Sequence, residues 1–163
     1  MLTEHENAIQ NFQFHGLTWG SSTAQMKSQF PSCIEQREGT DDSVGKHEYL
    51  VQAEGTDGAV LSFLDDHLYD IQLMYSPAKT NEMGSWNTVL QRLVERFGLA
   101  DAKSKGSDTG DDKIVASYYW RFEEITKYVG FDVYKIAVRV EFTDLAALWD
   151  VNARKEKTVN LGF

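Results

Sequence analysis

The chain has 163 residues, of which 42 % are hydrophobic and 25 % are charged, a balance typical of one globular domain that buries its own core. Its formal net charge of -9 at pH 7 disfavours binding to nucleic acid or to an anionic membrane surface, since both repel an acidic protein. The only cysteine is Cys33, which excludes an internal disulfide and a thiolate metal cluster.

The beginning of the chain predicts a loose end, a strand and a helix. Residues 1–11 are polar and are expected to be disordered, and alternating aromatic residues then predict a strand over 12–18. Ser22 and Gln25 match a capping box, in which each side chain satisfies a backbone N–H of the other residue. This pair predicts a helix over 22–30.

The next segment predicts three strands joined by short turns. Residues 46–54 alternate between apolar and polar side chains, and the runs 59–64 and 68–75 follow tight turns at 56–58 and 65–67. Connections this short favour antiparallel pairing, because parallel strands need a long crossover. In the last strand the residues expected to share one face are Tyr69, Ile71, Leu73 and Tyr75.

The second half repeats this order of helix and strands. An apolar stripe predicts a helix over 86–97, residues 100–113 are expected to form a mobile loop, and two long strands are predicted around 118–123 and 134–142. A short helix is predicted over 144–157. The residues that form the stripe of the first helix are Trp86, Val89, Leu90, Leu93, Val94 and Phe97.

These elements predict a two-layer α+β fold, with a curved antiparallel sheet and two main helices on one face. The predicted domain covers residues 12–157, and residues 158–163 are expected to form a loose tail. No stretch approaches the roughly 18 apolar residues of a membrane span. Without the basic and apolar regions of a signal peptide, the chain as it stands is expected in the cytoplasm, or in the cell envelope if a leader was removed.

Three motifs resemble a loose group of uncharacterised bacterial domain proteins. They are the Phe-x-Phe-x-Gly-Leu-x-Trp-Gly-x-Ser opening over 12–22, the hairpin over 63–71 and the helix end over 93–98. The layout is also similar in outline to the β-lactamase-inhibitor-like and outer-membrane-assembly lipoprotein folds. The resemblance implies helices packed on an antiparallel sheet and a binding role, and it supplies no catalytic residues. The chain departs from the group because it has no lipobox cysteine and no disulfide pair.

The aromatic residues exceed what two helices can cover, which points to an exposed sheet face. If the helices pack on one face only, Tyr119, Arg121, Lys135 and Arg139 are candidates for a binding surface on the other. Tyrosine and arginine are enriched among the residues that dominate protein–protein affinity. The core or a homodimer interface could equally absorb these aromatic side chains.

The Asp-rich loops are the candidates for a metal site. Asp108, Asp111 and Asp112 lie in a predicted loop, where oxygen ligands for calcium or magnesium are common. The pairs at 41–42 and 65–66 have the same character, but no loop matches the full calcium-binding pattern, and Asp also builds turns for local reasons. The turn interpretation is therefore favoured for these pairs, with the cluster at Asp108 the strongest exception.

The sequence favours a non-catalytic binding module that engages a protein partner through the exposed sheet face or the acidic loops. An inhibitor whose acidic surface covers a basic target is a special case of this hypothesis. The alternative is a calcium- or magnesium-dependent protein, or an enzyme, that uses the Asp-rich loops. No nucleophile elbow or phosphate loop is present, and no cofactor is predicted.

Overall fold

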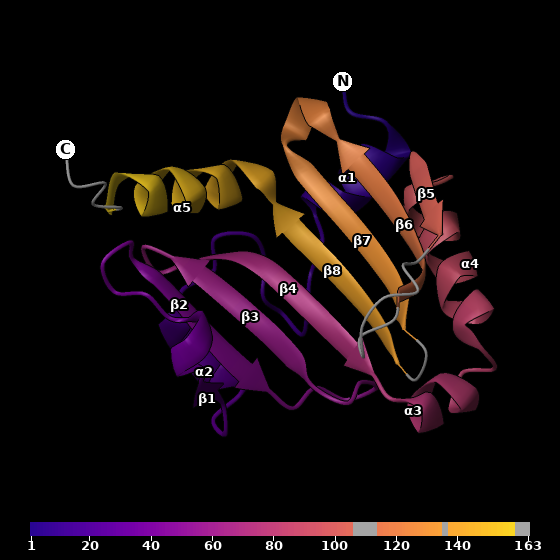
Figure 1. Cartoon of the computed structure of the whole chain (residues 1–163), viewed down its shortest axis with the longest axis horizontal. Coiled ribbons are helices and arrows are strands. Elements are labelled where there is room, and N and C mark those ends of the chain that lie inside the picture. The colour runs from indigo at the N-terminus through magenta and orange to yellow at the C-terminus, as the bar shows by residue number, and fades with distance from the viewer. Residues whose placement is uncertain (106–113, 135–136, 159–163) are drawn as a thin grey trace.

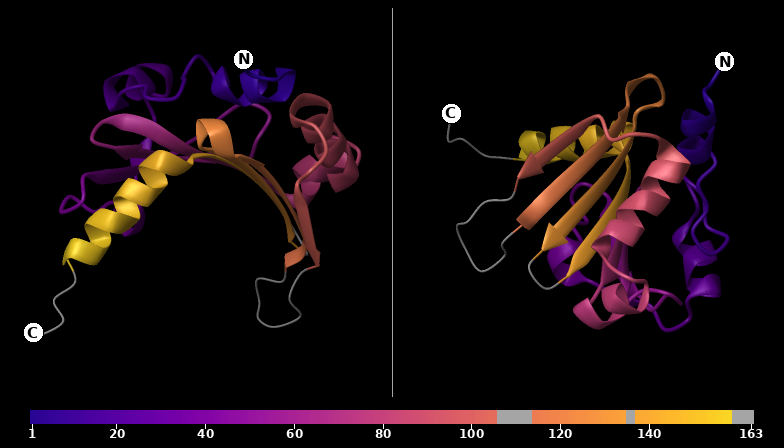
Figure 2. Two further views of the ribbon diagram at one scale, coloured as in Figure 1. Left: turned by 90° about the horizontal axis from the view of Figure 1, so that it is seen from above. Right: turned by 90° about the vertical axis from the view of Figure 1, so that its right-hand side faces the viewer.

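The computed structural model describes residues 1–105, 114–134 and 137–158, and its centre is one antiparallel sheet of eight strands in the order β1-β2-β3-β4-β8-β7-β6-β5. Figure 1 shows the strands from the front, and the view from above in Figure 2 (left) shows that the sheet bends into an arch with a convex and a concave face. The strands are β1 (Ile34–Glu35), β2 (Lys46–Val51), β3 (Ala59–Leu64), β4 (His67–Tyr75), β5 (Ala102–Lys105), β6 (Ile114–Phe122), β7 (Lys127–Tyr134) and β8 (Val138–Asp144). The predicted fold class, α+β with a curved antiparallel sheet, is confirmed.

Helices cover the convex face. Figure 2 shows α1, α2 and α4 outside the arch, whereas α5 runs along the concave side at one end. Ile9 of α1, Met26 of α2 and Phe97 of α4 belong to the main apolar core, together with Phe131 and Phe142 of the sheet. The helices are α1 (Glu4–Gln10), α2 (Thr23–Gln29), α3 (Pro77–Glu82), α4 (Trp86–Phe97) and α5 (Leu145–Thr158), and two 3-10 turns span Arg37–Gly39 and Glu123–Ile125.

The chain is built from two similar halves. Each half has two helices followed by four antiparallel strands, α1-α2-β1-β2-β3-β4 and then α3-α4-β5-β6-β7-β8. The last strands of the two halves, β4 and β8, pair with each other in the middle of the sheet. The concave face therefore has its centre where the two halves meet.

The N-terminal segment, expected to be disordered, instead forms α1. Thr3 and Glu6 make a capping box, and Ile9 is fully buried against the core. The indole Nε1 of Trp19 donates to the carbonyl of Ile9 at 2.8 Å and fixes the end of this helix. The buried isoleucine and the cap therefore stabilise a helix in a segment whose composition is polar.

The strand predicted over 12–18 is wrong. Phe14 and Leu17 form an isolated bridge around a tight turn, in which His15 has φ 49° and Gly16 has φ 83°. Phe12, Phe14 and Leu17 are nevertheless buried, as the alternating pattern indicated. The helix after this turn, α2, is confirmed, and its Ser22–Gln25 capping box is present.

A bulge changes the predicted faces of β4. The register between β3 and β4 shifts at Ser62 and Phe63, so that Phe63 pairs with Leu68 and Ser62 pairs with Asp70. Ile71 lies in the main core, whereas Tyr69 packs with Val151 of α5 in a separate apolar cluster. Tyr69 and Ile71 therefore do not share a face, because a bulge adds one residue to one strand and inverts the alternation.

The second half contains three elements that the sequence pattern did not reveal. Helix α3 begins at Pro77 behind the N-cap Ser76, and β5 occupies part of the loop expected over 100–113, of which residues 106–113 lie outside the described residues. Strand β7 lies between the two predicted long strands, which correspond to β6 and β8. Helices α4 and α5 are confirmed, and residues 159–163 of the expected tail also lie outside the described residues.

Candidate functional site

The predicted binding residues fall on the concave face wherever the structure describes them. Tyr119 pairs with Gly130 and Arg121 with Tyr128 on β6 and β7, while Trp120 between them faces the core. Arg139 alternates in the same way with the buried Val138 and Val140 on β8. Lys135 lies outside the described residues.

A buried aspartate organises the β6–β7–β8 part of the concave face. Asp132 is 9 % exposed, and it accepts a hydrogen bond from Ser117 Oγ at 2.6 Å. Arg139 Nη2 donates to its other carboxylate oxygen at 2.7 Å. Arg139 is therefore committed to an internal ion pair rather than presented as a free cation.

A pocket of about 400 Å³ opens at the centre of the concave face, where β4 meets β8. We call it the seam pocket, because it lies where the two halves of the sheet join. The sheet order places Tyr128 of β7 on one side of the central strands and Lys46 and Glu48 of β2 on the other. The central lining residues are Tyr69, Asp70 and Gln72 of β4 and Glu141 and Thr143 of β8.

Two of the acids that line the seam pocket, Asp70 and Glu141, lie next to each other. Asp70 is opposite Thr143 in the β4–β8 register, and Gln72 is opposite Glu141. Thr143 Oγ1 donates to Asp70 Oδ1 at 2.6 Å, and Gln72 Nε2 donates to Glu141 Oε2 at 2.8 Å. Both donors are neutral, and no ion pair to Asp70 or Glu141 is present within residues 1–105, 114–134 and 137–158.

The environment of Asp70 opposes its ionisation. Asp70 is 7 % exposed, and this burial raises the pKa of its carboxyl well above the usual range. The negative charge of Glu141 raises that pKa further, because two adjacent carboxylates repel each other. A buried acid with a strongly shifted pKa inside a pocket is a common mark of a functional site.

Two tyrosines complete the seam pocket. Burial is the main cause that raises the pKa of Tyr69, and the charge of Asp70 is the second cause. Burial also raises the pKa of Tyr128, where the charge of Glu141 is the second cause. Both hydroxyls therefore stay protonated at neutral pH. The ring of Tyr128 lies over Gly130, where an added Cβ would approach it to 2.9 Å, and 6.0 Å from the ring of Tyr119.

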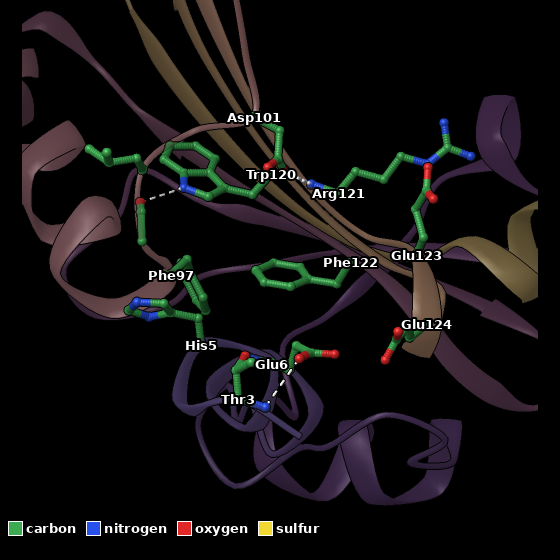
Figure 3. A pocket seen from close by; sticks show the side chains of 12 residues that line it. Thr3, His5, Glu6, Phe97, Asp101, Trp120, Arg121, Phe122, Glu123 and Glu124 are labelled. Carbon is green, nitrogen blue, oxygen red and sulfur yellow. Dashed lines mark hydrogen bonds and ion pairs between the residues drawn. The ribbon is translucent and has the colours of Figure 1, made fainter. Parts of the chain in front are cut away.

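A second hollow, of about 740 Å³, lies between α1 and the end of β6 (Figure 3). Its rings include Phe97 and Phe122, while its polar groups hold secondary structure together. Glu6 caps α1, Asp101 Oδ2 accepts from the backbone N–H of Arg121 at 2.7 Å, and Trp120 Nε1 donates to the carbonyl of Gly98 at 2.8 Å. These roles account for Glu6, Asp101 and Trp120 without a ligand.

The acidic pairs at 41–42 and 65–66 hold turns and tie them to other elements. Asp65 and Asp66 form the β3–β4 turn with φ values of 48° and 68°. Arg154 of α5 binds both carboxylate oxygens of Asp65, at 2.8 and 2.6 Å, and Thr23 Oγ1 donates to Asp66 at 2.6 Å. Asp41 accepts a hydrogen bond from the hydroxyl of Ser43 in its own turn.

The predicted metal ligands Asp108, Asp111 and Asp112 lie outside the described residues, so the metal hypothesis stays a prediction. Across the part of the chain that the structure describes, no group of three or more His, Cys, Asp or Glu side chains has a metal-binding arrangement. No helix among these residues is long and apolar enough to cross a membrane.

Comparisons with protein-family models, with curated proteins and with solved structures find no match to this chain. The site must therefore be interpreted from its own geometry. Sequence reasoning missed Asp70 and Glu141 as candidates, although each lies between two apolar residues in a predicted strand. The missing information was the β4–β8 pairing, which brings together two residues far apart in the chain.

Proposed function

We propose that this protein is a non-catalytic binding module that engages a protein partner through the concave face of its sheet. The observation that carries the proposal is the asymmetry of the sheet: helices cover the convex face, and α5 covers only one end of the concave face (Figure 2). The open part presents tyrosine, arginine and carboxylate side chains, among them Tyr119, Tyr128 and Glu141. Tyrosine and arginine are typical anchors of protein interfaces.

The curvature of the face supports a protein partner. A concave surface excludes water around a protruding segment better than a flat one does, and exclusion of water strengthens the polar contacts at its centre. The expected resemblance to β-lactamase-inhibitor-like folds, with helices on one side of an antiparallel sheet, is in line with this role. The net charge of -9 favours a basic partner surface, whose approach it accelerates at low salt.

The proposal is tested by capture from a lysate of the source organism with three forms of the protein. Wild type should retain a stoichiometric partner, and Tyr119→Ala on the concave face should bind it at least about tenfold more weakly, as expected for loss of an interface anchor. Leu99→Ala is the matched control, because Leu99 is 83 % exposed and lines the hollow of Figure 3 instead. This variant should bind the partner as wild type does.

Two results would contradict the proposal. One is a wild-type protein that captures nothing reproducibly, and the other is a partner that Tyr119→Ala retains but Leu99→Ala loses. Circular dichroism of each variant establishes that the fold is intact before the comparison is made.

A further inference from the structure

We propose that the seam pocket receives the guanidinium group of an arginine side chain from the partner. This inference rests on the proposed function, since it specifies which chemical group the centre of the concave face recognises. It is carried by the arrangement of Asp70 and Glu141, a pair of adjacent acids with which no cation of the described residues forms an ion pair, although Lys46 also lines the pocket.

The charged residues on either side of Asp70 and Glu141 have partners of opposite charge. Lys46 Nζ lies 3.7 Å from Glu48, on β2 at the edge of the seam pocket. Arg139, the nearest cation along β8, binds Asp132 at 2.7 Å. Asp70 and Glu141 are left with only the neutral donors Thr143 and Gln72.

The burial of Asp70 makes the pair of acids unfavourable in the protein without a bound cation. Asp70 is 7 % exposed yet lines the pocket, where its carboxyl group is hydrogen-bonded to the side chains of Thr143, Gln72 and Glu141. A hydrogen bond between two carboxyl groups requires a proton on one of them, because an ionised carboxylate only accepts. A cation in the pocket would offset the repulsion from Glu141 that raises the pKa of Asp70.

The shape and the tyrosines favour guanidinium over ammonium. Guanidinium is planar, donates through a fixed fork of N–H groups that suits carboxylates, and stacks on aromatic rings. In a volume of about 400 Å³ the pocket provides the carboxyl groups of Asp70 and Glu141, a third carboxyl group on Glu48, and the rings of Tyr69 and Tyr128. Lysine offers a smaller, more strongly hydrated charge, which loses more on transfer into such a pocket.

The proposed binding depends on pH in a defined direction. The titratable groups that line the pocket with Asp70 are Glu141, Tyr69, Tyr128 and, on β2, Glu48 with its partner Lys46. Guanidinium requires the carboxylate form of Asp70, so binding displaces the proton that the empty pocket favours. Affinity should therefore rise as the pH increases through the pKa of Asp70 in the free protein.

The experiment is a titration of the ¹⁵N-labelled full chain with N-acetyl-arginine methylamide, followed by NMR. We expect saturable shifts of the amides of residues 69–72 and 141–143, with a Kd in the range of about 1–10 mM that suits a single side chain. N-acetyl-citrulline methylamide, a neutral probe of nearly the same shape, should bind at least about tenfold more weakly. N-acetyl-lysine methylamide should fall between the two.

Matched variants locate the effect. Asp70→Asn and Glu141→Gln each keep the size of the side chain and should weaken binding of the arginine probe at least about tenfold. Glu124→Gln, in the hollow of Figure 3, removes an acid of the same charge and should leave this binding unchanged. Equal binding of the arginine and citrulline probes, no binding up to about 50 mM, or full binding by Asp70→Asn overturns the inference.

These results are separable from the test of the proposed function. If the arginine probe fails but partner capture still depends on Tyr119, the guanidinium pocket is wrong and the binding module stands. If the probe binds as expected while capture is independent of Tyr119, the concave face is not the partner surface, and the inference fails as a statement about the partner.

Discussion

The two faces of the sheet are built from the same strands but differ in their side chains: the convex face is apolar and the concave face is polar. On β7 the side chains of Val129, Phe131 and Val133 point to the helices and are at most 4 % exposed. Their neighbours Tyr128 and Asp132 point to the concave face, where hydrogen bonds and charges replace apolar packing. Alternation along a strand permits this, because successive side chains lie on opposite sides of a sheet.

The difference indicates that the convex face stabilises the fold, whereas the concave face is suited to binding. The convex face gains free energy from apolar surface removed from water, so any loss of volume there destabilises the fold. The concave face holds Asp70 in an environment that resists its charge, which costs stability at neutral pH. Residues kept against stability are expected where a protein binds a ligand.

The largest effect is expected on the convex face. Phe131→Ala removes a fully buried ring from the core and should lower the free energy of unfolding by about 3–5 kcal/mol. Tyr119→Ala, on the adjacent strand but on the concave face, should cost no more than about 1.5 kcal/mol, because its ring is half-buried. Guanidinium denaturation of both variants measures the difference, and similar losses would show that the two faces contribute equally to stability.

A smaller effect of opposite sign is expected in the seam pocket. The raised pKa of Asp70 gives a contribution to stability that is fully present below the unfolded-state pKa of about 3.9 and is lost as the pH rises through the folded-state pKa. Asp70→Asn keeps an acceptor for Thr143 and has no charge to bury. It should therefore stabilise the protein at pH 7 by about 1–3 kcal/mol, with the gain disappearing below about pH 4.

The control for this prediction is the other buried aspartate of the concave face. Asp132 is paired with Arg139 and hydrogen-bonded to Ser117, so Asp132→Asn should destabilise the protein at pH 7. Thermal unfolding of both variants at pH 4 and pH 7 tests the contrast. A loss of stability in Asp70→Asn at pH 7 would show that the carboxylate of Asp70 is already compensated within the protein.

Local patterns were sufficient to predict the elements that depend on local interactions. The stripe of α4, the capping box at Ser22 and the tight turn at Asp65–Asp66 each leave a short-range signal, and each is present in the structure. The expected curved antiparallel sheet followed from the short connections between strands. These features could be predicted because backbone geometry and side-chain spacing determine them within a few residues.

Strand β7 was missed because the turn before it carries no usual turn residue. The chain reverses through the 3-10 turn Glu123–Ile125, and Thr126 then adopts a left-handed conformation with φ 51°. Glycine or asparagine normally marks such a position, whereas a β-branched residue there is rare. Val129, Phe131 and Val133 alternate with other residues and are buried, but without a turn signal this pattern does not separate β7 from the strands beside it in the sequence.

The seam pocket could not be predicted, because it depends on pairing between distant strands. Asp70 and Glu141 come from different halves of the chain, and only the antiparallel contact of β4 with β8 makes them neighbours. Local signals do not specify which strands of two similar meanders meet in the middle. Tyr69 reaches the pocket only through the bulge opposite Ser62 and Phe63, which the regular alternation does not indicate.

The smallest predicted effect concerns the floor of the concave face. Gly130 has an ordinary strand conformation, so only the ring of Tyr128, 2.9 Å from an added Cβ, opposes a side chain there. Gly130→Ala should therefore cost about 1 kcal/mol as the ring moves away. In a Tyr128→Ala background the same change should be neutral or stabilising, since alanine restricts the unfolded chain more than glycine does. A double-mutant cycle by urea denaturation measures this coupling, and equal costs in both backgrounds would mean that the ring of Tyr128 does not rest on the strand.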